Sequence, residues 1–283
     1  MKRPKHKLTR RGMLSAIAAS LVVPATVRAE RRQARREYFE VNRVEITVPG
    51  LDDAHDGLTV AQLSDLHIGD DTPDARVMGA VATVNAMKPD LVMLTGDFVT
   101  TPRDPFERVP ELLKPLLDNP RTYAVLGNHD HWSDAKQVRH NLEGIGVTVL
   151  QNQHTVLDLQ GAPFTLVGVD DSTTRHDDVE KAFKGAGGGS RLVLAHTPTS
   201  IDKLPEYEGL LQLSGHTHGG QFYLGSVTDK MFAIGHQPYI RGLHHVHGNQ
   251  VYVNRGLGFG KGSRLPRVNS DPELTFFTLR ALA

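Results

Sequence analysis

Two histidines lie two residues apart in the segment Gly215-His216-Thr217-His218-Gly219-Gly220-Gln221. In an extended segment, side chains two residues apart point to the same face, so both imidazoles can reach one small object. The flanking glycines let that object approach the backbone. A metal ion is the candidate that these residue types favour. Because two imidazoles alone do not hold a catalytic metal, we expect further ligands elsewhere in the chain.

Residues of metal-ligating types follow five short apolar runs. The runs have the length and composition of buried strands, and they cover residues 58–63, 91–94, 123–126, 191–195 and 210–213. The polar residues behind them are Asp65, His67, Asp97, Asn128, His129, His196, His216 and His218. Any one of them alone is explained by a turn or by a satisfied polar side chain. Their repetition at five strand ends favours one shared site, since sites in α/β sheets form beyond the carboxyl ends of strands.

Further strands and helices predicted from the sequence indicate an α/β protein. Further strands are predicted at residues 43–48, 147–150, 154–159, 164–169, 251–254 and 274–279. Helical spacing predicts helices at residues 73–87, 105–117, 134–142 and 177–183. Within the second of these helices, Pro110 and Pro115 are expected to break or kink the helix.

The amino-acid composition limits the kinds of functional site that the chain can form. The chain has 283 residues, of which 39% are hydrophobic and 23% charged, as in a soluble globular protein with one large core. It contains no cysteine, which excludes disulfides, thiolate metal sites and cysteine nucleophiles. A transition metal must therefore be held by His, Asp, Glu or Asn, and the chain offers 15 histidines.

Charge is distributed unevenly along the chain. Residues 1–36 hold eleven of the 32 Lys and Arg residues but one of the 32 Asp and Glu residues. The remainder, with 21 basic and 31 acidic residues, therefore carries a formal charge of −10. A body of this charge lacks the basic face of a nucleic-acid-binding protein, so we expect no nucleic-acid partner.

The N-terminal segment has the order of an export signal. A basic stretch to Arg11 precedes an apolar run, residues 13–23, and residues 24–29 end in a small-residue cleavage pattern. Thr9-Arg10-Arg11-Gly12-Met13-Leu14 resembles the twin-arginine motif, which implies the twin-arginine export machinery as a partner. We expect a signal peptide at residues 1–29 and a basic linker at residues 30–42. The protein would act in the periplasm or at the outer face of the membrane, and the linker leaves peripheral attraction to anionic lipid as an alternative.

The strand-end residues together resemble a known family. Asp65-Leu66-His67-Ile68-Gly69, Gly96-Asp97, Gly127-Asn128-His129-Asp130, His196 and Gly215-His216-Thr217-His218 are similar, in order, to the five motif blocks of the calcineurin-like metallophosphoesterases. Gly219-Gly220-Gln221 resembles the exported bacterial branch. The resemblance implies a four-layer α/β/β/α sandwich over residues 43–283, with two divalent metals at its strand ends.

The resemblance also assigns roles. One metal would be held by Asp65, His67 and His218, the other by Asn128, His196 and His216, and Asp97 would bridge both. His129 would face the substrate and donate to a phosphoryl oxygen or protonate the leaving group, with Asp130 as its orienting partner. Asn128 and Arg255 are predicted to contact the substrate. Metal coordination would lower the pKa of a bound water to about 7 and give a hydroxide nucleophile.

Several assignments stay open at this level. Asp130 is explained as well by a helix cap, Arg255 by a surface salt bridge, and His244-His245-Val246-His247 by a polar hairpin instead of a third metal site. Many relatives have a second Asp where this chain has Thr100, which concerns the residues around the ligands and not the ligands themselves.

The leading function is a two-metal phosphodiesterase acting on a cell-envelope or lipid-linked phosphoester. A phosphomonoesterase, a metal-dependent hydrolase of another bond such as an amide, and a non-catalytic metal-binding envelope protein are the alternatives. Nitrogen and oxygen ligands admit Mn, Fe, Zn or Co. The aromatic and apolar residues at 222–224 are expected either to line an apolar leaving-group or lipid-facing surface or to pack in the core. We expect a monomer.

Overall fold

The computed structural model describes residues 34, 36–69, 72–118, 121–259 and 267–282. The predicted signal peptide, residues 1–29, lies outside them. From Phe39 to the C-terminal end the chain forms one compact unit, which the following paragraphs describe. Within the described part of the chain, no helix combines the length and the apolar character that a membrane span requires.

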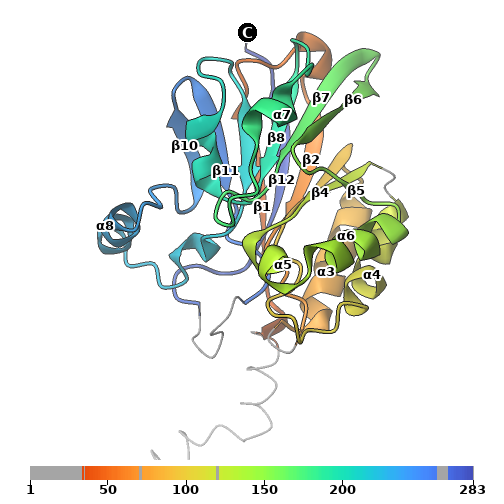
Figure 1. Cartoon of the computed structure of the whole chain (residues 1–283), viewed down its shortest axis with the longest axis vertical. Helices are drawn as coiled ribbons and strands as arrows, with labels where there is room; N and C mark the ends of the chain where they lie inside the picture. The colour runs from red at the N-terminus through yellow and green to blue at the C-terminus, as the bar shows by residue number, and fades with distance from the viewer. Residues whose placement is uncertain (1–33, 35, 70–71, 119–120, 260–266, 283) are drawn as a thin grey trace, which may run out of the picture. The chain divides into compact units, whose positions relative to one another are not determined.

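Two six-stranded sheets lie at the centre of this unit (Figure 1). The first sheet has the order β1-β12-β2-β3-β4-β5 and contains β1 Glu40–Thr47, β2 Thr59–Leu63, β3 Leu91–Thr95, β4 Thr122–Val125, β5 Thr148–Val149 and β12 Glu273–Arg280. The second has the order β10-β11-β9-β8-β7-β6 and contains β6 Gln153–Leu159, β7 Ala162–Val169, β8 Arg191–Ala195, β9 Leu211–Ser214, β10 Gly242–Val246 and β11 Asn249–Val253. Strands β2 to β5 are parallel, as are β7, β8, β9 and β11.

Alternate side chains along each strand pack on opposite faces of the sheet, and these faces contact different layers of the fold. In β3, Leu91 and Met93 face the core between the two sheets, whereas Val92 and Leu94 face the other way. Both sets are fully buried. Strands of parallel sheets that are covered on both faces read as continuous apolar runs, which is why the five runs were recognisable in the sequence.

Helices cover the outer faces of both sheets. The first sheet is covered by α3 Asp74–Met87, α4 Arg108–Leu113 and α6 Ala135–Gly144. The second sheet packs against α7 Val179–Phe183 and the 3₁₀ helix η3 Pro198–Lys203 through Ala182 and Ile201. The result is the α/β/β/α order that the resemblance implies.

Several boundaries differ from the predicted ones. β1 begins at Glu40, because residues 40–42, predicted as linker, already pair with β12. The helix predicted at residues 105–117 is α4 followed by the 3₁₀ helix η2 Lys114–Asp118. Pro110 does not break α4 because it lies in the first turn, where no intrahelical bond uses its missing N–H, whereas Pro115 falls at the change of helix type.

Two helices were not predicted. α5 Asn128–Ser133 begins directly at the strand end of β4, and its six residues are too few for a periodic pattern. α8 Ser226–Ile234 follows the segment from Gly215 to Gln221 that contains His216 and His218. Its apolar residues are mostly exposed, so a search for a buried helical face does not find it.

Candidate metal centre

The ends of five parallel strands place the predicted ligands in one region. β2 leads to Asp65 and His67, and β3 leads to Asp97. The other ligands are Asn128 after β4, His196 after β8, and His216 and His218 after β9. The first three strands belong to one sheet and the last two to the other, so the centre lies where the two sheets meet at their carboxyl ends.

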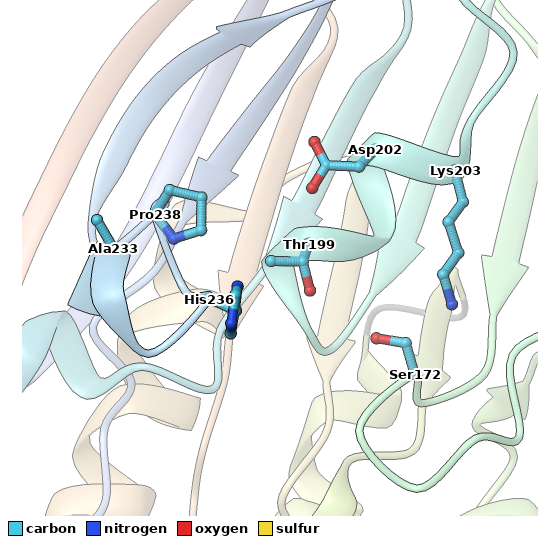
Figure 2. A pocket seen from close by; sticks show the side chains of 7 residues that line it. All are labelled: Ser172, Thr199, Asp202, Lys203, Ala233, His236 and Pro238. Atoms are coloured by element: carbon cyan, nitrogen blue, oxygen red, sulfur yellow. The ribbon is translucent and has the colours of Figure 1, made fainter.

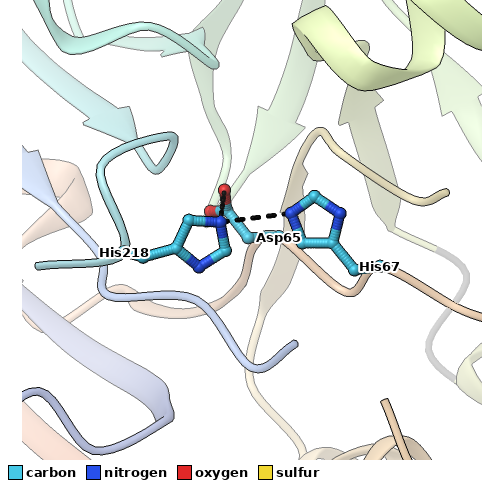
Figure 3. Close-up of side chains that lie close together, drawn as sticks. All are labelled: Asp65, His67 and His218. Atoms are coloured by element: carbon cyan, nitrogen blue, oxygen red, sulfur yellow. Dashed lines mark hydrogen bonds and ion pairs between the residues drawn. The ribbon is translucent and has the colours of Figure 1, made fainter. Parts of the chain in front are cut away.

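One group of donors consists of Asp65, His67 and His218 (Figure 3). Nε2 of His67 lies 3.2 Å from Nε2 of His218, which in turn lies 3.6 Å from Oδ1 of Asp65. One ligand atom from each residue falls within 4.8 Å of the others. This is the set that the resemblance assigns to one metal.

A second group surrounds Asp97. Its Oδ2 lies 3.3 Å from Nε2 of His196 and 3.6 Å from Nε2 of His67, so this carboxylate faces imidazoles of both predicted sets. Asn128 Oδ1 lies 3.2 Å from Nε2 of His196 and 2.7 Å from Nδ1 of His216. A second group of three donors consists of Asp65, Asp97 and His196, with one ligand atom from each within 4.8 Å of the others. The seven predicted ligands thus form one continuous cluster with Asp97 in the middle.

The backbone at these positions is strained. Asp65, His67, Asp97, His216 and His218 all have a positive φ, between 45° and 73°. Non-glycine residues rarely adopt this region, and strain of this kind concentrates at functional sites. The left-handed turns let consecutive residues leave a strand end and direct their side chains into the same small volume.

Glycines permit the close approach of the carboxylates. A Cβ on Gly215 would overlap the carboxylate of Asp65 and the hydroxyl of Ser64, and a Cβ on Gly127 would overlap the carboxylate of Asp97. Gly219 and Gly220 are closely packed on the side where a Cβ would lie. Gly219 is packed against the side chain of Arg255, and Gly220 against α8 and neighbouring apolar side chains.

Burial sets the protonation of most imidazoles. It lowers the pKa of His67 to about 3 and the pKa of His216 to about 4, where the neighbouring His196 adds to the effect. It also lowers the pKa of His218 well below its usual value, and the guanidinium of Arg267 acts in the same direction. Three of the four imidazoles are therefore neutral at pH 7, the state in which histidine binds a metal.

The pKa values of Asp65, Asp97 and His196 are shifted by burial and by the charges of their neighbours. Burial raises the pKa of Asp65 to about 6, with His196 opposing and Asp97 adding to the rise. Burial also opposes the charge on Asp97, but His196, His67 and His129 outweigh it and lower the pKa of Asp97. Asp97 in return raises the pKa of His196 well above its usual value despite burial. Buried carboxylates and neutral imidazoles at these distances fit a divalent cation, which would replace the proton between Asp97 and His196.

Hydrogen bonds fix the orientation of two imidazoles. Nδ1 of His196 donates to the carbonyl of Thr95 at 2.7 Å, and Nδ1 of His67 lies 3.0 Å from Oγ1 of Thr100. The carbonyl of Thr95 requires the proton of His196 to be on Nδ1, and both contacts turn the Nε2 atoms of the two rings toward the cluster. Thr100 is the residue that departs from the family pattern, and its hydroxyl now has a defined partner.

His129 lies at the edge of the cluster without joining it. Its Nδ1 donates to the carbonyl of Thr100 at 2.8 Å, which leaves Nε2 free of that bond. The ring packs edge-on against His67 at 5.0 Å and against the exposed Trp132 at 5.1 Å. This placement suits a side chain that faces substrate.

Asp130 does not contact the imidazole of His129, which is oriented by Thr100 instead. Its carboxylate accepts backbone N–H bonds at 2.9 Å from Gly127 and Asp97, and at 2.8 Å from Phe98. Through the bond to Gly127, the Asp130 side chain at the third position of α5 caps the backbone N–H of the residue that precedes the helix. These contacts are those of the helix-cap alternative, and they tie the ends of β3 and β4 together.

Arg255 lies away from the donor atoms of the cluster. Its guanidinium contacts Glu273 at 2.5 Å and Glu40 at 2.6 Å. Burial disfavours the charge on both partners, but Arg255 lowers the pKa of Glu273, and Glu273 raises the pKa of Arg255. The ion pair is partly buried, so it differs from the surface salt bridge considered from the sequence. Its predicted contact with substrate has no support in this geometry.

Arg267 is a neighbour of the cluster that the sequence did not single out. Its Nη2 donates to Nδ1 of His218 at 2.7 Å, and its Nη1 donates to the carbonyl of Arg255 at 2.6 Å. The side chain is buried, and burial lowers its pKa to about 9, so it stays charged at pH 7. No local pattern distinguishes Arg267 from other basic residues, because it reaches His218 across 49 residues of chain.

The segment His244-His245-Val246-His247 forms the hairpin of β10 and β11. His247 and Gly248 form its turn, both with positive φ, as a tight two-residue connection requires. Among the described residues, the groups of three metal-ligating side chains do not include these histidines.

A cavity of about 490 Å³ lies between segments that follow the ligand loops (Figure 2). Thr199, Asp202 and Lys203 of η3, which begins two residues after His196, form one wall. The residues after Gln221 form the opposite wall through Ala233 in α8 and the turn behind it. Its lining carries hydroxyl, carboxylate, ammonium and imidazole groups.

Comparison with known proteins agrees with this site. Residues 58–220 match the family described as calcineurin-like phosphoesterase. The chain is 30% identical over 292 residues to the uncharacterized metallophosphoesterase YkuE of Bacillus subtilis, covering 99% of both chains. It is 33% identical over 221 residues to phosphodiesterase YaeI of Escherichia coli, covering 77% of this chain and 80% of the relative. It is 26% identical over 324 residues to the UDP-2,3-diacylglucosamine pyrophosphatase LpxG of Chlamydia trachomatis, covering 93% and 96%.

The chain belongs to the calcineurin-like metallophosphoesterases, a family of metal-dependent phosphoric ester hydrolases. All seven candidate ligands lie within residues 58–220, the part of the chain that matches the family, whereas β1, β10, β11 and β12 of the two sheets lie outside it.

Proposed function

We propose that this protein is a phosphodiesterase that uses two divalent ions and acts on a lipid-linked or cell-envelope phosphoester. The cluster of seven candidate ligands, with Asp97 at its centre, carries the proposal. Asp65, His67 and His218 would hold one ion. Asn128, His196 and His216 would hold the other, and the central position of Asp97 supports a bridging role.

The ions would supply two things when bound. They would lower the pKa of a water molecule toward neutrality and neutralise charge on the phosphoryl oxygens. The neutral imidazoles of His67 and His216 and the buried carboxylate of Asp65 would offer their lone pairs to the ions. The hydrogen bonds from His196 to Thr95 and between His67 and Thr100 keep the rings from turning.

His129 is proposed as the group that faces the substrate. Its Nδ1 is fixed by the carbonyl of Thr100, so Nε2 is the atom that can donate to a phosphoryl oxygen or protonate the leaving alkoxide. Asp130 contributes by holding the loops of Asp97 and Asn128 together.

The substrate class is proposed from the printed functions of relatives. One relative is named a phosphodiesterase, and another is named a pyrophosphatase of a diacylated glucosamine nucleotide. An amphiphilic phosphoester of the cell envelope is consistent with both names. The predicted twin-arginine signal supports the proposal that the protein acts outside the cytoplasmic membrane.

The test uses Mn²⁺-loaded protein with a bis-aryl and a mono-aryl phosphate. We expect hydrolysis of the diester to exceed that of the monoester, and we expect Asp97→Ala to lose both activity and bound metal by elemental analysis. Asp158→Ala, which replaces an exposed aspartate on β6, is the control and should keep both. A preference for the monoester would replace the proposal by a phosphomonoesterase. Absence of phosphoester hydrolysis, with unchanged metal content in Asp97→Ala, would overturn it.

A further inference from the structure

Helix α8 exposes most of its large apolar side chains to solvent. Val227, Met231 and Ile234 follow the spacing i, i+4, i+7 and therefore share one face of the helix. Their exposed fractions are 56%, 66% and 81%. Leu224, just before the helix, is also exposed. Together with Phe222 these residues, here called the α8 stripe, form an apolar patch within thirteen consecutive positions.

The opposite side of α8 is attached to the metal-binding segment. Thr228 is buried, and its hydroxyl donates to the carbonyl of Phe222 and accepts from the backbone N–H of Leu224. A Cβ on Gly220, two residues after the ligand His218, would collide with Thr228 and approach Phe232. The helix is therefore packed on the end of the ligand loop, with the stripe facing away from it.

We infer that the α8 stripe docks the protein on the surface of a lipid bilayer, so that an amphiphilic phosphoester reaches the metal centre from the membrane. The inference rests on the proposed function for its substrate class. A patch of this kind marks an interaction surface, since isolated apolar side chains on a surface need no explanation but a contiguous helical stripe does. A helix with one apolar face can lie in a membrane interface with that face buried at the boundary of headgroups and acyl chains.

The cations beside the stripe favour a bilayer over a second copy of the chain. Lys230 lies on the same side of the helix as Val227 and Ile234, and its ammonium can reach lipid phosphates while its stem lies along the apolar surface. Arg241 stacks on Tyr223 at 3.3 Å beside the patch and adds a second cation.

The helix also lies between the α8 stripe and a cavity that carries polar groups. Ala233 and the turn with His236 and Pro238 form one wall of this cavity, and Asp202 and Lys203 lie on the other (Figure 2). An amphiphile whose acyl chains stay at the stripe would thus meet polar groups on the side of η3, the helix that follows His196.

The experiment measures sedimentation of the full chain with vesicles of phosphatidylethanolamine and phosphatidylglycerol. The test variant is Val227→Ser, Met231→Ser and Ile234→Ser combined. The matched control is Met78→Ser with Val156→Ser, two apolar residues that are each 56% exposed on α3 and β6. We expect the α8 variant to lower the vesicle partition coefficient at least tenfold and the control to leave it within twofold of wild type. Because both variants keep the N-terminal segment, its own affinity for lipid cancels in the comparison.

A second variant detects insertion without removing the stripe. Ile234→Trp should give a blue-shifted emission and quenching by brominated lipid when vesicles are added, whereas Val156→Trp should not. Equal partitioning of wild type and the α8 variant, together with no response at position 234, would overturn the inference. A wild-type dimer that the α8 variant converts to a monomer would overturn it as well, because the stripe would then be a self-association surface.

The two proposals fail separately. If the protein hydrolyses a water-soluble bis-aryl phosphate but the α8 variant partitions like wild type, the docking inference is wrong and the proposed function stands. If binding to vesicles depends on α8 but no phosphoester is hydrolysed, the proposed function is wrong and the docking stands. With both correct, the α8 variant loses at least tenfold activity on a phosphodiester embedded in vesicles and keeps its activity on the soluble diester.

Discussion

Oγ1 of Thr100 lies 3.0 Å from Nδ1 of His67. Many relatives carry a carboxylate where this chain has Thr100, and a carboxylate would make the imidazole a stronger donor to the metal. A hydroxyl fixes the same ring orientation without adding a negative charge to a cluster that already contains Asp65 and Asp97. The departure therefore changes the charge around His67 while keeping its geometry.

Replacing the Thr100 hydroxyl should weaken metal binding. In Thr100→Val the ring of His67 loses its partner while the volume of the side chain stays similar, and loss of such a partner costs about 10–100-fold in metal affinity. Titration calorimetry with Mn²⁺ measures the change. Thr100→Ser restores the hydroxyl and should bind within threefold of wild type; a Val variant that binds as tightly as wild type would show that the contact does not orient the ligand.

Metal affinity should increase with pH. Metals compete with protons: His196, whose pKa Asp97 raises despite burial, must release one proton, and below pH 6 Asp65 must release a second. His67 and His216, with pKa values of about 3 and 4, are already neutral at pH 5. The slope of log K against pH should therefore be about one above pH 6 and about two below it. Calorimetry in buffers of different ionisation enthalpy counts the protons, and equal affinities at pH 5.5 and 7.5 would refute this account.

His129 should act on the substrate and not on the metals. His129→Gln should lower kcat by about 10²–10⁴-fold while bound metal, measured by elemental analysis, stays unchanged. The loss should be greater for an alkyl leaving group than for a nitrophenolate, because a poor leaving group needs the proton more. His245→Gln changes an exposed histidine on β10 and serves as the control. An equal loss for both leaving groups would exclude the role of general acid.

Arg255 should matter for folding more than for turnover. Arg255→Met leaves Glu273 buried without its partner, and breaking a buried pair in this way costs about 3 kcal/mol of unfolding free energy. Urea unfolding measures this, and Arg139→Met, which breaks an exposed pair with Glu143, should cost below about 0.5 kcal/mol. A tenfold rise in KM for a soluble diester with unchanged stability would instead assign Arg255 to the substrate.

The same pair predicts a change in pH dependence. In wild type, Arg255 lowers the pKa of Glu273, so this contribution to stability is present above the unfolded pKa of about 4.5 and is lost as pH falls through the lower folded value. In Arg255→Met the guanidinium no longer opposes burial, and although the hydroxyls of Tyr252 and Thr275 still donate to Glu273, we expect burial to raise its folded pKa above the unfolded one. That variant should therefore lose stability as pH rises from 4.5, and the double variant Arg255→Met with Glu273→Gln should remove the dependence.

Residue order alone identified much of the site. The apolar runs before Asp65, Asp97 and His196 are recognisable because strands covered on both faces contain few polar residues. Equivalent polar residues at successive strand ends then fall at one edge of a sheet by topology, without knowledge of distances. The ligand types and the α/β class followed from this order, and the family motifs supplied the two-sheet arrangement.

Contacts between distant segments could not be obtained in this way. Asp130 reaches the loop of Asp97 across 33 residues, and Arg267 reaches His218 across 49. Nothing in the local sequence distinguishes a cap from an orienting group, or a buried arginine from an exposed one. The outward face of α8 was missed for the same reason, since a helical pattern shows which residues share a face and not what that face meets.

The sequence by itself determined which side chains gather into the candidate metal centre, because strand period and chain order fix where these side chains emerge. Only the tertiary structure decided how those ligands are held and charged, through the hydroxyl of Thr100, the carbonyl of Thr95, the cap by Asp130 and the guanidinium of Arg267. Burial and hydrogen bonding depend on what surrounds a group in space, and folding brings those surroundings together from segments far apart in the chain.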